Sequence, residues 1–162
     1  MSSLDEFLIP YIISQVASII ILIVAWKSTK WARVLFALLF FWASATNMYI
    51  GITKPDTYQE YADLAIPVYG DFINGWFSHY NYIVIPLIAA GQFLIALGML
   101  LKRWWVTAAC FGAIIFLLSI APLMVGAAFP FSITVSIAAW IILLNDDKSY
   151  FWKKEQTRLS IS

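Results

Sequence analysis

This sequence has few charged residues, only one cysteine and only one histidine. Charged residues make up 12% of its 162 residues and hydrophobic residues 62%, whereas soluble domains carry about 25% charged residues. Such a chain cannot cover a water-facing surface, so its composition excludes a soluble enzyme, a nucleic-acid-binding protein and a disordered segment. The formal net charge of +1 does not by itself indicate a class of partner.

The single cysteine and the single histidine limit redox and metal chemistry. Cys110 cannot form an internal disulfide, a CxxC redox pair or a thiolate metal site, and it lies in an apolar run typical of a small buried side chain. With His79 as the sole histidine, a bis-histidine haem or a histidine-based metal cluster is excluded within this chain. We therefore expect no bound metal and no redox cofactor.

Long uncharged runs are abundant. A membrane core of about 30 Å requires roughly 20 apolar residues in a helix. The last uncharged run, residues 104–145, is about twice that length and must fold back, with turn signals at Pro122, Gly126 and Pro130. We predict an all-α membrane protein, a bundle of five transmembrane helices in one domain. The predicted spans are residues 7–26, 34–53, 83–101, 104–123 and 128–145.

Basic residues predict the orientation of this bundle. All of them except Lys54 lie between spans one and two, between spans three and four, or after span five. These residues are Lys27, Lys30, Arg33, Lys102, Arg103, Lys148, Lys153, Lys154 and Arg158. Because basic residues are enriched in cytoplasmic connections, we expect the N-terminus outside and the C-terminus in the cytoplasm. Tryptophans at the same borders, such as Trp26 and Trp104, are typical of interfacial anchors.

The predicted outer loop, residues 54–82, carries most of the remaining polarity. Pro55 and Asp56 predict the start of a short amphipathic helix, with Asp56 capping its amides, and Pro67 and Gly70 predict its end. A second short amphipathic segment is predicted from Asp71 to Phe77. The polar rim of this loop contains Glu60, Asp63, Asp71 and His79. Two interpretations remain open: a lid over a cavity that opens outward, and a structural cap with solvated acids.

The polar residues inside the predicted spans are all uncharged. This pattern counts against an ion pump, a proton-coupled transporter or an intramembrane hydrolase. Gln15, Asn47 and Gln92 are the most costly to leave unpaired in lipid, so we expect them to face the bundle. There they either join helices by hydrogen bonds or, for Asn47 and Gln92, bind the head group of a quinone or lipid.

Small residues recur at spacings that predict close helix contacts. Span four contains the pairs Ala108 with Gly112 and Ala109 with Ala113, each four residues apart, which allows a neighbouring helix to approach. In span three, Gly91 and Gly98 share a face. Such patterns are common in membrane helices and specify no function.

Four stretches between residues 33 and 144 form a pattern found in a known family. They are RVLFALLFFWASATNMYIG, the outer segment TKPDTYQEYADLAIPVYGDFI, the helix PLIAAGQFLIALGMLLKRWW with its basic pair, and GAIIFLLSIAPLMVGAAFPFSITVSIAAWIILL. Together they resemble the DoxX-like family of small bacterial and archaeal membrane proteins. The resemblance implies a four-helix core, to which residues 7–26 add one helix, in a prokaryotic cytoplasmic membrane. It also implies an accessory role beside quinone-linked or redox-stress enzymes, without a fixed catalytic motif.

Three functional hypotheses follow. The first is a non-catalytic multi-pass subunit or scaffold in a membrane protein complex. The second is a quinone- or lipid-binding protein with a pocket beneath the outer loop. The third is a small enzyme or transporter that uses the outer acids with the histidine. No residue is predicted to be catalytic; the candidate ligand-binding residues are Asn47, Gln92, Glu60, Asp71 and His79.

Overall fold

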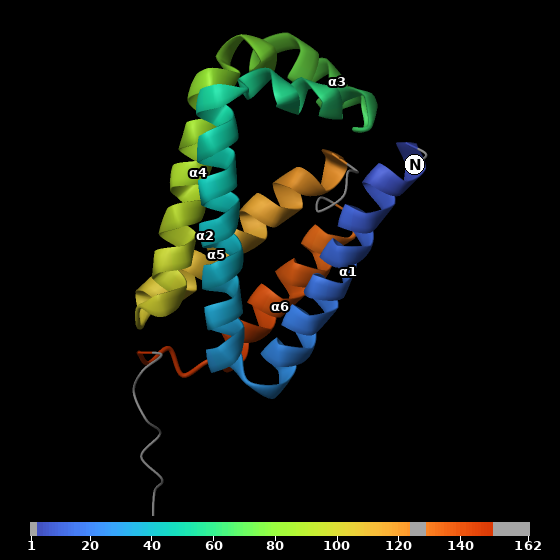
Figure 1. Ribbon diagram of the computed structural model, residues 1–162. Helices are drawn as coiled ribbons and strands as arrows, with labels where there is room; N and C mark the ends of the chain where they lie inside the picture. Colours follow the sequence, from blue (N-terminus) through green and yellow to red (C-terminus); the bar gives the residue numbers. More distant parts are fainter. Residues whose placement is uncertain (1–2, 124–128, 151–162) are drawn as a thin grey trace, which may run out of the picture.

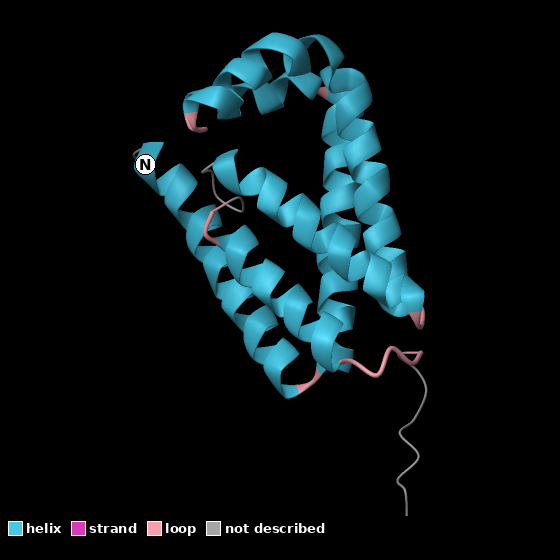
Figure 2. Cartoon of the chain, turned by 180° about the vertical axis from the view of Figure 1, so that it is seen from behind, coloured by secondary structure: helices cyan, strands magenta, loops and turns pink. Residues whose placement is uncertain are grey.

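A computed structural model describes residues 3–123 and 129–150, with side chains from residue 11 onward. Within these ranges the chain is helical and contains no strand (Figures 1 and 2), as the sequence predicts. The main helices are α1 (Ser3–Lys27), α2 (Thr29–Thr53), α3 (Pro67–Phe72), α4 (Ser78–Leu100), α5 (Trp104–Ile120) and α6 (Phe131–Asn145). Shorter turns of helix are η1 (Pro55–Asp63), η2 (Ile73–Phe77) and η3 (Ala121–Leu123).

Three helical stretches among the described residues are long and apolar enough to cross a membrane. They are Thr29–Thr53, Pro67–Leu100 and Trp104–Leu123, and two shorter apolar helices cover Tyr11–Lys27 and Phe131–Asn145. This length and composition support the predicted membrane protein.

The helices form two groups. α2 and α4 run antiparallel and pack side by side. α1, α5 and α6 form an inclined group that contacts this pair through α5 on α4 and through α1 and α6 on α2 (Figure 1). Helix direction alternates along the chain from α1 to α2 and from α4 to α6. As a result, the α1–α2 and α4–α5 connections and the segment after α6 all lie at one end of the molecule.

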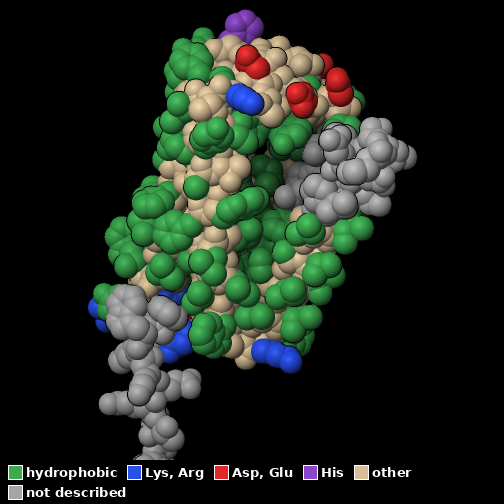
Figure 3. Space-filling model, viewed as in Figure 1, with side chains coloured by type: hydrophobic (Ala, Val, Ile, Leu, Met, Phe, Trp, Pro, Cys, Tyr) green, Lys and Arg blue, Asp and Glu red, His purple; other side chains and the backbone are tan. Residues whose placement is uncertain are grey.

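The two ends of the molecule differ in charge (Figure 3). We call one of them the basic end; its described residues include Lys27, Lys30, Arg33, Lys102, Arg103 and Lys148. The opposite end consists of residues 54–77, which we call the cap and which carry Asp56, Glu60, Asp63 and Asp71. The sequence predicted this separation of basic from acidic residues.

The core of the bundle is built largely from small side chains. Ala32, Ala96, Ala113 and Ala138 are fully buried, and they let neighbouring helices approach closely. Large apolar side chains instead point outward from every main helix; Trp42 is 69% and Ile115 68% exposed. A water-soluble protein does not expose apolar area on this scale, whereas a lipid environment solvates it.

The cap departs from its predicted structure in two respects. η1 is a 3-10 helix, and Asp56 makes no capping hydrogen bond to it. Its carboxylate accepts instead from Gln59 and from Asn81 of α4, at 3.0 and 2.9 Å. The prediction of an Asp56 cap is therefore wrong, because a buried amide on another helix takes the carboxylate.

The helical path kinks at the polar stretch around Asn74, where Gly75 has non-helical angles. α3, η2 and α4 follow one another directly, and α4 begins at Ser78, five residues before the predicted span at residue 83. The Ser78 hydroxyl donates to the carbonyls of Asn74 and Gly75, at 3.0 and 2.8 Å. These local bonds satisfy backbone groups at the kink, where Gly75 has non-helical angles.

Candidate functional site

A chain of polar side chains connects the cap to the interior of the α2–α4 pair. Asn47 on α2 donates through Nδ2 to Oε1 of Gln92 on α4, at 2.8 Å. Tyr58 of η1 donates its hydroxyl to Oδ1 of Asn47. Nearby, Ser44 donates to the carbonyl of Ala89 at 2.7 Å. The sequence predicted that Asn47 and Gln92 face the bundle, and the structure places them in direct contact.

The side-chain amide of Gln92 has spare hydrogen-bonding capacity. Gln92 is only 3% exposed, and Nε2 has no hydrogen-bond partner among the described residues. In the described part of the chain, Ser136 Oγ is the one side-chain nitrogen or oxygen atom that is fully buried and has no hydrogen-bond partner. Gln92 Nε2 is not among such fully buried atoms, so it retains a small accessible surface. An unpaired amide donor in an apolar bundle favours an acceptor from outside the chain.

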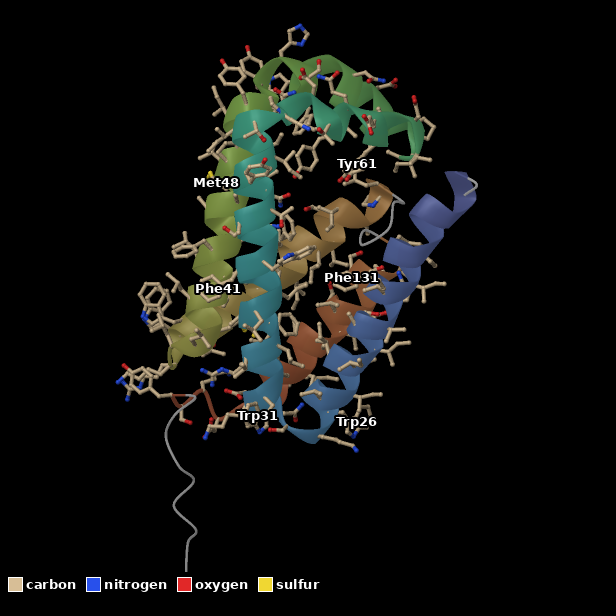
Figure 4. The ribbon with its side chains drawn as sticks, viewed as in Figure 1. Trp26, Trp31, Phe41, Met48, Tyr61 and Phe131 are labelled. Atoms are coloured by element: carbon tan, nitrogen blue, oxygen red, sulfur yellow. The ribbon has the colours of Figure 1, made fainter. Side chains whose placement is uncertain are left out.

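Two tyrosines of the cap lie next to this amide pair. Tyr58 and Tyr61 pack edge to face, with ring centroids 5.8 Å apart. Figure 4 shows Tyr61 on the side of the cap that faces the bundle, with Phe131 at the near end of α6. The surface is hollowed beneath the cap beside α2 (Figure 3). Tyr61 thus lies on the side of the cap that faces the bundle, and Tyr58 connects the cap to the amide pair.

The cap is attached to the bundle at both of its sides. At one side, Tyr58 and Asp56 bond to α2 and α4. At the other, the Ile66 amide donates to the carbonyl of Pro122 at 3.1 Å, and the Tyr69 hydroxyl donates to that of Ser119 at 2.9 Å. The cap therefore bridges from the α2–α4 pair to the end of α5.

The exposed acids and the histidine form no joint site. Glu60, Asp63, Asp71 and His79 all lie on the surface. His79 Nδ1 is 2.8 Å from the carbonyl of Gly75, within its own helical segment. Among the described residues, no three His, Cys, Asp or Glu side chains are placed to hold a metal ion. The predicted ligand-binding set thus divides: Asn47 and Gln92 meet, whereas Glu60, Asp71 and His79 join neither them nor one another.

Gln15 was expected to bond across helices, as Asn47 and Gln92 do. Its side chain is half-buried, and its Nε2 donates to the hydroxyl of Ser14 on the same helix at 3.3 Å. Gln15 therefore lies outside the amide pair and offers a matched comparison for it.

A buried ion pair at the basic end was not predicted from the sequence. Arg33 was grouped with the basic residues between spans, but it lies within α2 and is 0% exposed. Its Nη1 is 2.9 Å from Oδ1 of Asp146, just after α6. The signal was available in the sequence, because Arg33 borders one predicted span and Asp146 borders another at the same end, where such residues tend to pair.

The cap tyrosines lead to a prediction on pH. Burial, followed by the charge of Tyr61, raises the pKa of Tyr58 to about 12. A raised pKa means that the contribution of the neutral hydroxyl to stability is complete below the unfolded value near 10 and is lost as pH rises through the folded value. We expect Tyr58→Phe to remove one tyrosinate absorbance step near pH 12, measured at 295 nm. Loss of a step near pH 10 instead would contradict the burial of this hydroxyl.

No family model, no curated protein and no solved structure matches this chain. The candidate site is therefore defined by its residues and geometry.

Proposed function

We propose that this chain is a multi-pass membrane protein that binds the polar head of an apolar molecule, a quinone or a lipid, beneath its cap. The observation that carries the proposal is the unpaired Nε2 donor of Gln92, on a side chain 3% exposed. A carbonyl or ester oxygen of such a molecule accepts this donor. Leaving a buried amide group without a partner costs about 1–3 kcal/mol in proteins, so an acceptor stabilises the site.

The surroundings of the amide suit a ligand that is apolar except for its head. Tyr58 and Tyr61 present aromatic rings, which stack with or pack edge to face against a flat ring system. The same helices also carry exposed apolar side chains, such as Leu87 on α4, which suit contact with an acyl or isoprenoid chain. The chemistry is recognition by hydrogen bonds, because a side-chain amide neither releases its proton nor acts as a nucleophile at neutral pH.

The number of membrane crossings and their orientation are part of the same proposal. We infer five crossings, by α1, α2, α4, α5 and α6, with the basic end in the cytoplasm and the N-terminus outside, in a prokaryotic cell membrane. The gathering of basic residues at one end supports this orientation. Membership of the DoxX-like family is also proposed, on the sequence pattern of residues 33–144. An accessory role beside a membrane redox enzyme is compatible with a quinone-binding pocket, because such enzymes exchange electrons with quinones.

Ligand retention tests the proposal. We expect Gln92→Leu to lose most bound quinone or lipid, because leucine offers no donor, whereas Gln15→Leu removes an equal amide elsewhere and retains it. The measurement is native mass spectrometry of each variant, extracted mildly and incubated with decylubiquinone or with a diacyl phospholipid. Equal retention by the two variants, or no retention of either probe by the unmodified chain, would reject the pocket.

A second candidate, a non-catalytic subunit or scaffold, is favoured by one observation. Asn47, Gln92 and Tyr58 bond to one another, so the same residues also serve as cross-links between the cap and two helices. Under this candidate the chain leaves the membrane with a stoichiometric protein partner, and no small mass is bound. The third hypothesis, an enzyme or transporter, receives no support from the exposed and separate Glu60, Asp71 and His79.

A further inference from the structure

A pocket lies at the basic end, far from the cap. It has a volume of about 390 Å³ and forms where the turn between α4 and α5 meets the segment that follows α6. Its lining residues are Lys102, Arg103, Asp147, Lys148, Ser149 and Tyr150.

The pocket is rich in positive charge that the described residues do not neutralise. The ion pair found in the described part of the chain joins Arg33 to Asp146, so Lys102, Arg103 and Lys148 have no carboxylate partner there. The single acid of the lining, Asp147, accepts from the backbone and the hydroxyl of Ser149, at 3.0 and 2.9 Å. Three cations therefore face one carboxylate that is already hydrogen-bonded.

The backbone of the pocket is held in an uncommon conformation. Arg103 and Lys148 have φ angles of 55° and 53°, a region that non-glycine residues rarely adopt and that costs of order 1–3 kcal/mol per residue. The Arg103 amide donates to the carbonyl of Lys148 at 2.7 Å. Asp146 accepts from the Lys148 amide, also at 2.7 Å, while it binds Arg33. The buried ion pair thus fixes two cationic residues side by side.

Tryptophans beside the pocket indicate that it lies at the level of lipid head groups. Trp104 and Trp105 follow Arg103 directly, stack with ring centroids 4.0 Å apart, and are 61% and 46% exposed. Exposed indoles beside basic residues are typical of the membrane interface. The anion that reaches three cations at this level is the phosphate of a membrane lipid.

We propose that this pocket binds the phosphate group of an anionic phospholipid. Arg103 and Lys148 bind the phosphate oxygens by charge-assisted hydrogen bonds, and Lys102 adds a third charge from above the Tyr150 ring, 4.7 Å from its centroid. The site is separate from the recess under the cap and does not depend on the function proposed for it.

Lipid binding to the full chain in detergent tests this proposal. Native mass spectrometry with phosphatidylglycerol and phosphatidylcholine measures the affinity for each. We expect preferential binding of phosphatidylglycerol, and about thirty-fold weaker binding after the paired change Arg103→Gln and Lys148→Gln, because two charges at the membrane surface are lost. Glutamine imposes no greater backbone strain than the residues it replaces, and Lys102→Gln alone, at a position with no positive φ, is expected to weaken binding several-fold.

A matched control removes the same charge elsewhere: Lys27→Gln with Lys54→Gln, neither of which lines the pocket. We expect this variant to bind phosphatidylglycerol like the unmodified chain. Equal weakening in the control, or equal affinity for phosphatidylcholine, would overturn the proposal. Inorganic phosphate is the second probe: if it binds alone and displaces the lipid at similar concentration, the pocket is a site for free phosphate and the lipid assignment is wrong.

Discussion

Replacing Arg33 by leucine is expected to destabilise the bundle by about 3–5 kcal/mol, because it leaves a buried carboxylate without its partner. Asp146 is 8% exposed and is paired with Arg33 at 2.9 Å. The same guanidinium also donates to the carbonyls of Met99, Leu101 and Ser149. Arg33 therefore joins α2 to the end of α4 and to the segment after α6.

The carbonyls of Met99 and Leu101 have no helical partner, because they lie at the C-terminus of α4. Arg33 satisfies both of them, as a cationic side chain near a helix C-terminus does. Their loss makes the expected effect larger than that of an ion pair alone. It also predicts that the double change of Arg33→Leu with Asp146→Leu recovers only part of the loss, because the carbonyls stay unpaired.

Unfolding of the purified chain in mild detergent, followed by circular dichroism against denaturant, measures this effect. Lys27→Leu is the control, since it removes one charge from an exposed side chain at the same end. We expect Lys27→Leu to change stability by less than about 0.5 kcal/mol. If the two variants unfold together, the buried pair does not hold the helices.

Replacing Gly98 by valine is the second change with a large expected effect. A Cβ atom at Gly98 would lie 2.8 Å from the Cβ of Ala109 and 3.0 Å from the carbonyl oxygen of Trp105. Neither neighbour can move aside without shifting α5, because one is a backbone atom and the other is attached directly to the backbone. Overpacking of this kind costs about 1–3 kcal/mol, and the rigid neighbours place Gly98→Val at the upper end.

Gly91 supplies the matched control on the same helix. A Cβ atom there meets nothing within 4 Å, so Gly91→Val is expected to be neutral or slightly stabilising, as glycine is a poor helix former. Thermal unfolding of both variants in detergent measures the difference. Equal melting temperatures would show that α4 and α5 are not in close contact at Gly98.

Gly91 and Gly98 differ in burial, and the sequence alone could not predict this difference. Their seven-residue spacing places them on one face of α4, yet Gly98 is buried and Gly91 is exposed. The inclined α5 approaches α4 near its C-terminal end, where Gly98 meets Ala109. Spacing along one helix defines a face, whereas the neighbour that covers the face comes from a distant part of the chain.

The sequence by itself determined the properties that are local. Helix type and position follow from runs of apolar residues, and α2, α4 and α5 lie within a few residues of the predicted spans. The membrane class follows from the scarcity of charge. That Asn47 and Gln92 face the bundle follows from the cost of an amide in lipid. The five crossings and their orientation stay predictions, because they refer to a membrane. Family membership stays a prediction, because it requires matching relatives.

Only the tertiary structure decided which distant groups meet. In the sequence, Arg33 is one of several basic residues near the ends of spans. Its partner Asp146 lies more than a hundred positions later, and only the fold brings the two together. In the sequence, Tyr58 is one aromatic residue of a predicted amphipathic helix. Only the fold of the cap places its hydroxyl on the side chain of Asn47. The physical reason is the same in both cases. A polar group buried in an apolar bundle must find a partner, and the packing of helices far apart in sequence determines which partner is within reach.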